Sequence, residues 1–276
     1  MLSLEHAGHV ATLWLDRPEK RNAMGMPLFG ELPRAMAALG ENDGVRAVVI
    51  AGRGPAFSVG LDLAALASLA SDAGDEDATG AARPPSEARR AMQTMKSIRS
   101  LQASISSVAE CPKPVIAAIH GWCIGGGVDL VSACDIRLCA ADSVFSVRET
   151  RMAMVADIGS LQRLPLIVPM GVVAELAYTG KDIDALFAER IGLVNAVYGD
   201  ARATLAAARS MAGEIAANPP LAVQGTKAVL SELHGARVAA GLRYVAAWNA
   251  GQLHSRDLTE AVKAFFEHRS PDFTGE

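Results

Sequence analysis

Short apolar runs and longer amphipathic stretches alternate along the first half of the chain. Three apolar runs, at residues 9–16, 46–52 and 113–121, are each bounded by Gly, Pro, Asn or Asp, which is typical of buried strands. Residues 26–42 carry apolar side chains at the spacing of an amphipathic helix, despite Pro33. This alternation predicts an α/β fold, in which parallel strands are joined by right-handed helical crossovers and the sheet is covered by helices.

The rest of the chain departs from this alternation in two places. Residues 68–90 are rich in Ala, Asp, Gly and Pro without a clean period, which fits either a mobile excursion near a binding cleft or a plain surface insertion. From Arg202 onward the pattern is almost wholly helical, with a break at the Asn-Pro-Pro of residues 218–220. We therefore expect a core at residues 1–200 and a C-terminal helical region at residues 201–276 that packs on the core or on a neighbouring subunit.

Composition and charge narrow the classes of partner. Of the 276 residues, 50% are apolar and 20% are charged, which suffices for one large core. The net charge of -4 gives no broad basic surface, so neither nucleic acid nor an anionic membrane is an expected partner. No uncharged apolar run reaches the roughly 18 residues of a membrane span, and the N-terminal stretch lacks the pattern of a signal peptide. We expect a cytoplasmic protein.

The four cysteines do not suggest a metal site. They lack paired C-x-x-C spacing and no histidine pair accompanies them, so buried free thiols are expected and a metal is not. They are Cys111, Cys123, Cys134 and Cys139.

Three consecutive glycines, Gly125, Gly126 and Gly127, stand between an apolar run and a helix-like segment. Glycine lets the backbone turn sharply and brings its N–H groups close to a ligand. The first N–H groups of the following helix also lack partners within it, so this turn is a possible donor site for a negative oxygen. A tight packing turn explains the same residues. A dinucleotide site is not favoured, because residues 52–57, GRGPAF, lack the last glycine of G-x-G-x-x-G.

A second glycine turn lies at residues 54–66, again directly after a predicted buried strand. Two such turns can each supply one backbone N–H to a single oxygen. Two convergent donors form an oxyanion hole, in which each donor contributes about 3 to 4 kcal/mol to stabilising the transition state.

Several stretches together resemble the crotonase superfamily, the enoyl-CoA hydratase and isomerase family, over essentially the whole chain. The N-terminal stretch LDRPEKRNAM, the loop AFSVGLDL and the segment PKPVIAAIHGWCIGGGVDLVSACDIRLCAADSVF carry the resemblance. It implies a crotonase-like spiral of ββα units with a C-terminal helical region that forms trimers, which often pair into hexamers. It also implies a coenzyme A thioester as substrate, so that coenzyme A is part of the substrate and no separate cofactor is expected.

The resemblance also assigns the residues around the thioester. The backbone N–H groups of Leu61 and Gly126 match the oxyanion-hole donors, which stabilise the thioester enolate. Within the first loop, substrate contact is assigned to Ser58, Val59, Gly60 and Asp62.

A basic segment near the N-terminus is a second candidate for substrate binding. Arg21, with Arg17 and Lys20 and with possible help from Lys227, has the charge to meet the coenzyme A phosphates. Solvated surface charge explains each of these residues equally well.

Three acids fall where the family places its variable chemistry: Asp129, Glu149 and Asp157. Each also has an ordinary explanation, as a helix-start charge, a solvated loop acid and a turn or cap residue, respectively. Asp157 lies in the apolar stretch AMVADIGSLQRL, where burial tends to raise the pKa of a carboxyl group and favours both proton donation and acceptance.

The stretches GGGVDLVSACDIR, VADIGSLQRLP and AVQGTK are most similar to the branch of the family that shifts 3,5-dienoyl thioesters to 2,4-dienoyl thioesters. That resemblance implies that Glu149 removes the C2 proton and Asp157 protonates C6, while Asp129 has an auxiliary, orienting role. Arg151 and Met154 stand where small or apolar residues are expected to line the acyl pocket, which leaves the acyl-chain preference open.

Two alternatives stay open at this stage. A hydratase or a delta-3-delta-2 enoyl isomerase needs only Asp129 and Glu149, with Asp157 structural. A noncatalytic acyl-CoA or RNA-binding scaffold is the alternative of another class, against which the glycine turns, the acids and the acidic charge balance argue.

Overall fold

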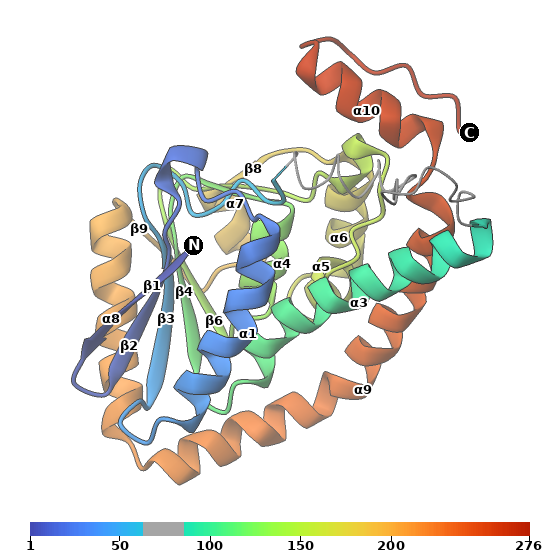
Figure 1. The fold of residues 1–276 in the computed structure, drawn as a ribbon. Coiled ribbons are helices and arrows are strands. Elements are labelled where there is room, and N and C mark those ends of the chain that lie inside the picture. Colours follow the sequence, from blue (N-terminus) through green and yellow to red (C-terminus); the bar gives the residue numbers. More distant parts are fainter. Residues whose placement is uncertain (63–85) are drawn as a thin grey trace.

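A six-stranded sheet forms the centre of the fold in the computed structural model, which describes residues 1–62 and 86–276 (Figure 1). The strand order is β1-β2-β3-β4-β6-β9, with β1 antiparallel to β2 and the other pairs parallel. The strands are β1 Leu2–Ala7, β2 Val10–Leu15, β3 Ala47–Gly52, β4 Val115–Ile119, β6 Ile136–Ala140 and β9 Ala196–Tyr198. The predicted buried strands correspond to β2, β3 and β4, and the predicted α/β class is confirmed.

A second, three-stranded sheet has the order β5-β7-β8. Its strands are β5 Trp122–Ile124, β7 Val144–Ser146 and β8 Ile183–Asp184. β5 follows β4 directly and β7 follows β6, so each of these two turns of the chain places one strand in each sheet before a helical segment. This repetition is the expected spiral of ββα units.

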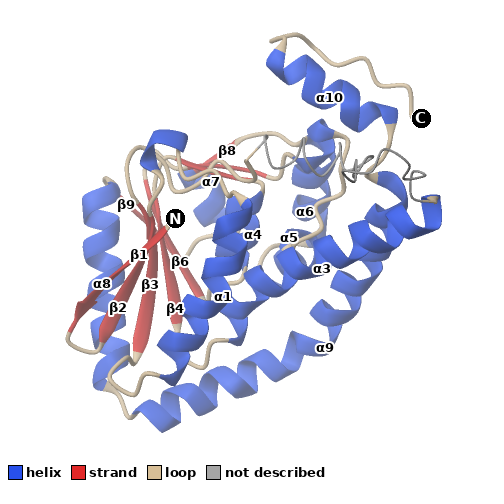
Figure 2. Cartoon of the chain, viewed as in Figure 1, coloured by secondary structure: helices blue, strands red, loops and turns tan. Residues whose placement is uncertain are grey.

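Helices cover both faces of the large sheet (Figure 2). Those of the core are α1 Met26–Glu41, α3 Glu87–Glu110, α4 Gly126–Ser132, α5 Ser160–Arg163, α6 Met170–Thr179 and α7 Ala185–Arg190, with the short 3-10 turns η1 Pro18–Lys20, η2 Glu149–Met152 and η3 Leu164–Leu166. α1 continues through Pro33, as expected. Residues 68–85 of the predicted loop lie outside the described residues. Ser86 is the N-cap of α3 and residues 87–90 form its first turn, so the loop prediction is wrong for residues 87–90.

Ser86 explains the beginning of α3. Its side chain accepts a hydrogen bond from the backbone N–H of Arg89, which is the usual N-cap contact and satisfies one donor of the first helical turn. A polar run containing Ser and Glu therefore starts a helix here rather than extending a loop.

Alternate residues of the central strands point to opposite faces of the sheet and build two cores. On β3, Val48 and Ile50 belong to the larger core, which α1, α3 and α4 cover. Val49 faces the smaller core, where α8 packs with Ala208 and Ala212 against the sheet. Alanine at a spacing of four residues lets α8 approach the strands closely.

The C-terminal region is helical, as the sequence predicts. It contains α8 Ala201–Ala217, α9 Pro220–Gln252 and α10 Arg256–Phe266. The second half of α9 packs beside α3 and α5, and α10 packs against η2. No helix within the described ranges 1–62 and 86–276 is long and apolar enough to cross a membrane.

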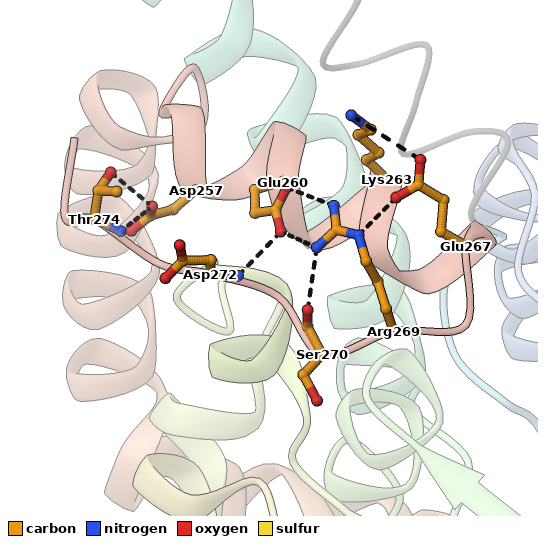
Figure 3. A network of polar contacts seen from close by, with 8 residues as sticks. All are labelled: Asp257, Glu260, Lys263, Glu267, Arg269, Ser270, Asp272 and Thr274. Atoms are coloured by element: carbon orange, nitrogen blue, oxygen red, sulfur yellow. Dashed lines mark hydrogen bonds and ion pairs between the residues drawn. The ribbon is translucent and has the colours of Figure 1, made fainter.

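The last residues fold back on α10 (Figure 3). Arg269 forms an ion pair with Glu260, which also accepts a hydrogen bond from the backbone N–H of Asp272 at 3.0 Å. Asp257 accepts a hydrogen bond from the backbone N–H of Thr274 at 2.8 Å. These contacts hold the C-terminal tail against the helix.

Candidate active site

Two glycine turns meet between the sheets. Ser58 N–H donates to Trp122 O at 2.9 Å and Ile124 N–H donates to Ser58 O at 3.0 Å, so the first turn runs parallel to β5. Each turn contains a glycine with positive φ, at 85° for Gly60 and 51° for Gly125. Only glycine adopts such angles at no steric cost, which is why the sequence needs it at both places.

The backbone amides of Leu61 and Gly126 lie close together at this meeting point. Met24 N–H donates to Gly60 O at 2.7 Å and Asp62 N–H donates to Met24 O at 2.9 Å, so the N–H of Leu61 points away from Met24. A Cβ built on Gly126 lies 3.6 Å from Leu61 N, so the two turns are in contact.

Both amides are suited to donate to one oxygen. Gly126 begins α4, so its N–H has no partner within the helix. A Cβ built on Gly60 lies only 3.2 Å from Gly126 N, and a side chain there would crowd that amide. The structure therefore brings together the two predicted donors.

Asp129 lies on α4 and is 1% exposed. Its Oδ1 accepts a hydrogen bond from the backbone N–H of Ser160, the first residue of α5. Burial raises the pKa of Asp129 above its ordinary value, and the negative charge of Asp157 adds to this, while the Ser160 hydrogen bonds and Arg163 oppose it. One carboxylate oxygen is thus fixed by the backbone and does not reach into open solvent.

Glu149 begins η2, beside the second glycine turn. Its Oε1 lies 3.2 Å from the place of a Cβ built on Gly125, so glycine makes room for the carboxylate. Its Oε2 is buried and has no hydrogen-bond partner among the described residues, although the residue as a whole is only half-buried. Burial is the largest cause that raises the pKa of Glu149 well above its ordinary value. Repulsion from the charge of Asp129, and to a smaller extent from that of Asp157, raises it further.

Asp157 lies in the segment between η2 and α5. Its Oδ2 accepts a hydrogen bond from Asn249 Nδ2 at 2.7 Å, and its backbone carbonyl accepts one from Gln102 Nε2 at 2.6 Å. Burial raises the pKa of Asp157 to about 6, against the opposing effect of the Asn249 hydrogen bond.

The three acids therefore form one electrostatic unit. Desolvation raises the pKa of each carboxyl, and the negative charges of Asp129 and Asp157 raise the pKa of Glu149 further. Ionising all three neighbouring carboxyls is disfavoured by repulsion between their negative charges. The three acids together therefore retain protons near neutral pH and can both accept and donate them. Without a substrate, a shared proton favours Glu149 over Asp157, because the pKa of Glu149 is raised further.

The remaining residues of the first loop mainly hold its shape. Ser58 is fully buried, its hydroxyl donates to Asn22 O at 2.8 Å and accepts from Gly60 N–H at 3.2 Å, so we assign it to supporting the loop rather than to touching a ligand. Val59 is half-buried and its N–H donates to Arg21 O at 3.2 Å. Asp62 forms an ion pair with Arg17 at 2.7 Å.

The proposed phosphate-binding cations separate into two groups. Arg21 is exposed and has a positive φ of 49°, at the end of η1, next to exposed Lys20. Arg17 is engaged with Asp62. Lys227 is buried, and its Nζ donates to Asp135 Oδ2 at 2.7 Å and to Lys113 O at 2.9 Å. This pairing explains Lys227 as a structural cation, and its suggested help with phosphates stays a prediction.

Arg151 is held at the surface of the fold. It is exposed, and its Nε donates to Thr179 O at 3.1 Å, at the C-terminal end of α6. Met154 is half-buried.

Two site residues escape the sequence analysis, Gln102 on α3 and Asn249 on α9. Both are buried amides that bind Asp157, and Asn249 lies 92 residues from it in the chain. Neither belongs to a motif, and the only signal is a polar side chain on a buried helix face, which does not identify its partner.

All four cysteines are buried and free. Within residues 1–62 and 86–276, no group of three or more His, Cys, Asp or Glu side chains is arranged to hold a metal ion.

Known proteins are similar to this chain over most of its length. The sequence model of the family described as "Enoyl-CoA hydratase/isomerase" matches residues 5–83 and 85–276. A mitochondrial "Delta(3,5)-Delta(2,4)-dienoyl-CoA isomerase" of Dictyostelium discoideum is 43% identical over 96% of this chain and 87% of its own length. A peroxisomal protein of the same description from Arabidopsis thaliana is 42% identical, over 95% of this chain and 91% of its own length.

Solved structures show the same architecture. An enoyl-CoA hydratase/isomerase from Mycobacterium paratuberculosis is 29% identical, with a TM-score of 0.83 over 95% of this chain and 97% of that one. An enoyl-CoA hydratase from Bacillus anthracis is 31% identical, with a TM-score of 0.73 over 100% of this chain and 99% of that one.

Proposed function

The chain belongs to the enoyl-CoA hydratase/isomerase family, and from this we propose that it is an isomerase that converts a 3,5-dienoyl-CoA into the conjugated 2,4-dienoyl-CoA. The observation that carries the proposal is the pair formed by Glu149 and Asp157, two carboxyls whose pKa is raised by desolvation and that interact electrostatically. Glu149 also lies beside the Gly125 turn, which precedes the Gly126 donor. The two relatives described above carry the name of this activity and are more than 40% identical over nearly the whole chain.

The thioester oxygen binds between the N–H groups of Leu61 and Gly126. Negative charge grows on this oxygen when a proton leaves C2, so the two donors stabilise the dienolate more than the substrate. Glu149 stands beside the Gly125 turn, on the carbonyl side of the site, and takes the C2 proton.

Asp157 delivers the second proton. The electron pair released at C2 spreads along the conjugated chain, and protonation at C6 leaves double bonds at C2 and C4. After this step the proton rests on Glu149 and Asp157 is ionised, which is the arrangement that the empty site favours. One proton must therefore return to Asp157 from solvent, and one must leave Glu149, before the next turnover.

Asp129 orients the site rather than transferring a proton. Its Oδ1 holds the N–H of Ser160, which fixes the turn that follows Asp157. Its charge also raises the pKa of Glu149 and makes that carboxylate a stronger base once it is ionised.

The proposal extends to substrate and assembly. Coenzyme A enters as part of the acyl thioester, without a separate cofactor, and exposed Arg21 is the cation that we assign to its phosphates. A homotrimer or homohexamer is proposed through the C-terminal helices, and cytoplasmic location stays a prediction.

A hydratase or a delta-3-delta-2 enoyl isomerase is the second candidate, because Glu149 beside the oxyanion donors is enough for either. An assay of wild type and Asp157→Asn separates them. We expect wild type to generate conjugated diene absorbance from a 3,5-dienoyl thioester, and the variant to lose about 100- to 10,000-fold in rate with an unchanged fold. Hydration of a 2-enoyl thioester at full rate in the variant, without diene formation by wild type, would support the second candidate instead.

A further inference from the structure

Asn249 reaches the proposed proton donor from the C-terminal region. It is 1% exposed on α9, and both hydrogens of its amide nitrogen are used. One hydrogen bond goes to Val155 O at 2.8 Å and the other to Asp157 Oδ2 at 2.7 Å.

The Val155 carbonyl fixes the orientation of this amide. A carbonyl oxygen only accepts hydrogen bonds, so the group facing it must be the NH₂ of Asn249 and not its oxygen. The same NH₂ then necessarily donates to Asp157 Oδ2. Asn249 Oδ1 is buried and accepts no hydrogen bond from any described residue, so no other contact competes for the orientation of the amide.

This geometry divides the two oxygens of Asp157. Oδ2 accepts the hydrogen bond from the NH₂ group. In a protonated carboxyl the C=O oxygen is a better acceptor than the O–H oxygen, so this contact favours the proton on Oδ1. We propose that Asn249 is a positioning residue that confines the transferable proton to Oδ1 of Asp157 and keeps that oxygen turned toward the acyl chain. The inference rests on the proposed function, in which Asp157 protonates C6.

Few other groups act on Asp157. Asp129 and Glu149 interact with it electrostatically, and Arg163 interacts with Asp129. From the helices packed at this point, α3 and α9, the side chains that bind Asp157 are the neutral amides Gln102 and Asn249.

Gln102 provides a matched control. It is also a buried amide on a long helix and also binds Asp157, but it donates to the backbone carbonyl, at 2.6 Å, and to Leu242 O at 2.9 Å. It does not touch the carboxylate. Replacing either amide removes two buried hydrogen bonds, while only the Asn249 change frees Oδ2.

We expect Asn249→Leu to lower kcat about 100-fold with little change in KM, because a misplaced proton donor slows the chemical step. Loss of a donor to the ionised form also raises the pKa of Asp157. The acidic limb of the rate profile should move up by about one pH unit, the size expected for one hydrogen bond to a charged group. Gln102→Leu should keep the wild-type limb even where its rate falls.

A second readout does not depend on turnover. The carboxyl carbon of Asp157, identified by its loss in Asp157→Asn, is titrated by carbon-13 NMR in each variant. If Asn249→Leu does not fold, Asn249→Asp is the alternative variant, because it keeps the volume of the side chain. It should also raise the titration midpoint of Asp157, because a second carboxyl then shares the proton.

The outcomes are distinct. A midpoint and an acidic limb that stay at their wild-type positions in the folded Asn249 variants would overturn the inference. If the wild-type protein forms no conjugated diene, the proposed function fails, while the NMR midpoints still decide whether Asn249 controls the proton on Asp157.

Discussion

At the scale of single residues, the site depends on glycines whose lack of a Cβ lets neighbouring atoms come close. Gly60 leaves room for Ile124 O and Gly126 N, and Gly125 leaves room for the carboxylate of Glu149. A Cβ built on Gly60 would lie 2.7 Å from Ile124 O and 3.2 Å from Gly126 N, and one built on Gly125 would lie 3.2 Å from Glu149 Oε1. These close approaches explain why both turns contain glycine.

Gly60→Ala should damage catalysis through the backbone. Its Cβ would lie 2.7 Å from Ile124 O, so the turn must shift and the N–H of Leu61 moves with it. We expect kcat to fall about 100- to 1,000-fold, the usual cost of losing one oxyanion donor, in a steady-state assay.

Gly8→Ala is the control for this change. Gly8 also has a positive φ, at 58°, but a Cβ there meets nothing within 4 Å and lies in the β1–β2 turn, away from the site. It should lower stability modestly and leave kcat unchanged. An equal loss of activity in both variants would mean that backbone strain, rather than displacement of the donor, is responsible.

The carboxyl pair predicts a bell-shaped rate profile. Turnover needs Glu149 ionised and Asp157 protonated, which is one proton on the pair. Below the lower apparent pKa both groups are protonated and the base is lost, and above the higher one both are ionised and the acid is lost. Because burial raises the pKa of Asp157 to about 6 and that of Glu149 further, the optimum should lie above pH 6. A rate that rises steadily with pH, without a descending limb, would show that no protonated group is required.

At the scale of elements, the C-terminal helices complete the site instead of only enclosing it. α9 supplies Asn249 to Asp157, and α10 packs against η2, which carries Glu149. α9 is anchored at its other end by Lys227, whose ammonium binds Asp135 and Lys113 O across the end of the large sheet.

Lys227→Met should destabilise the protein by about 1.5 to 3 kcal/mol, the cost of losing charged hydrogen bonds to Asp135. Urea unfolding measures this change. Activity per folded molecule should remain, because Lys227 is engaged inside the fold and does not face the substrate. A raised KM for the thioester with unchanged stability would instead assign Lys227 to phosphate binding.

The strands that were predictable from the sequence are those with the clearest pattern. β2, β3 and β4 are continuous apolar runs between turn residues, whereas β5, β7 and β8 have only two or three residues and carry no periodicity. The start of α3 was missed because Ser86 acts as an N-cap inside a Pro-rich and Ala-rich stretch.

The site also contains residues that the sequence identified and one that it did not. The glycine turn identifies Gly126 as a candidate from the residues alone, whereas Glu149 is a candidate through the resemblance to the family. The structure places the carboxylate of Glu149 beside that glycine turn. The sequence could not identify Asn249 as a partner of Asp157, because the contact depends on how α9 packs and not on any local pattern. The roles given to all of these residues stay predictions until they are tested.

At the scale of the whole molecule, α9 and α10 leave apolar side chains in solvent. They include Val229, Leu230, Leu233, Tyr244, Trp248, Phe265 and Phe266. Large apolar side chains exposed along the helices of the C-terminal region favour a surface that binds another chain, which is the physical argument for the proposed trimer.

Sedimentation should therefore give three or six times the chain mass of 28.8 kDa. Leu233→Glu should weaken the assembly by placing a charge on the exposed face of α9, while Leu4→Glu on β1 should not. A monomer at micromolar concentration in the wild type would contradict the proposed trimer without affecting the assignment of the acids.

The most direct test of the central claim is where solvent hydrogen appears in the product. The protein is incubated with a 3,5-dienoyl thioester in deuterium oxide, and the product is examined by NMR. Transfer from Asp157 predicts a conjugated 2,4-dienoyl thioester that carries one deuterium at C6. A product hydrated at C3, or a conjugated product without deuterium at C6, would contradict the account.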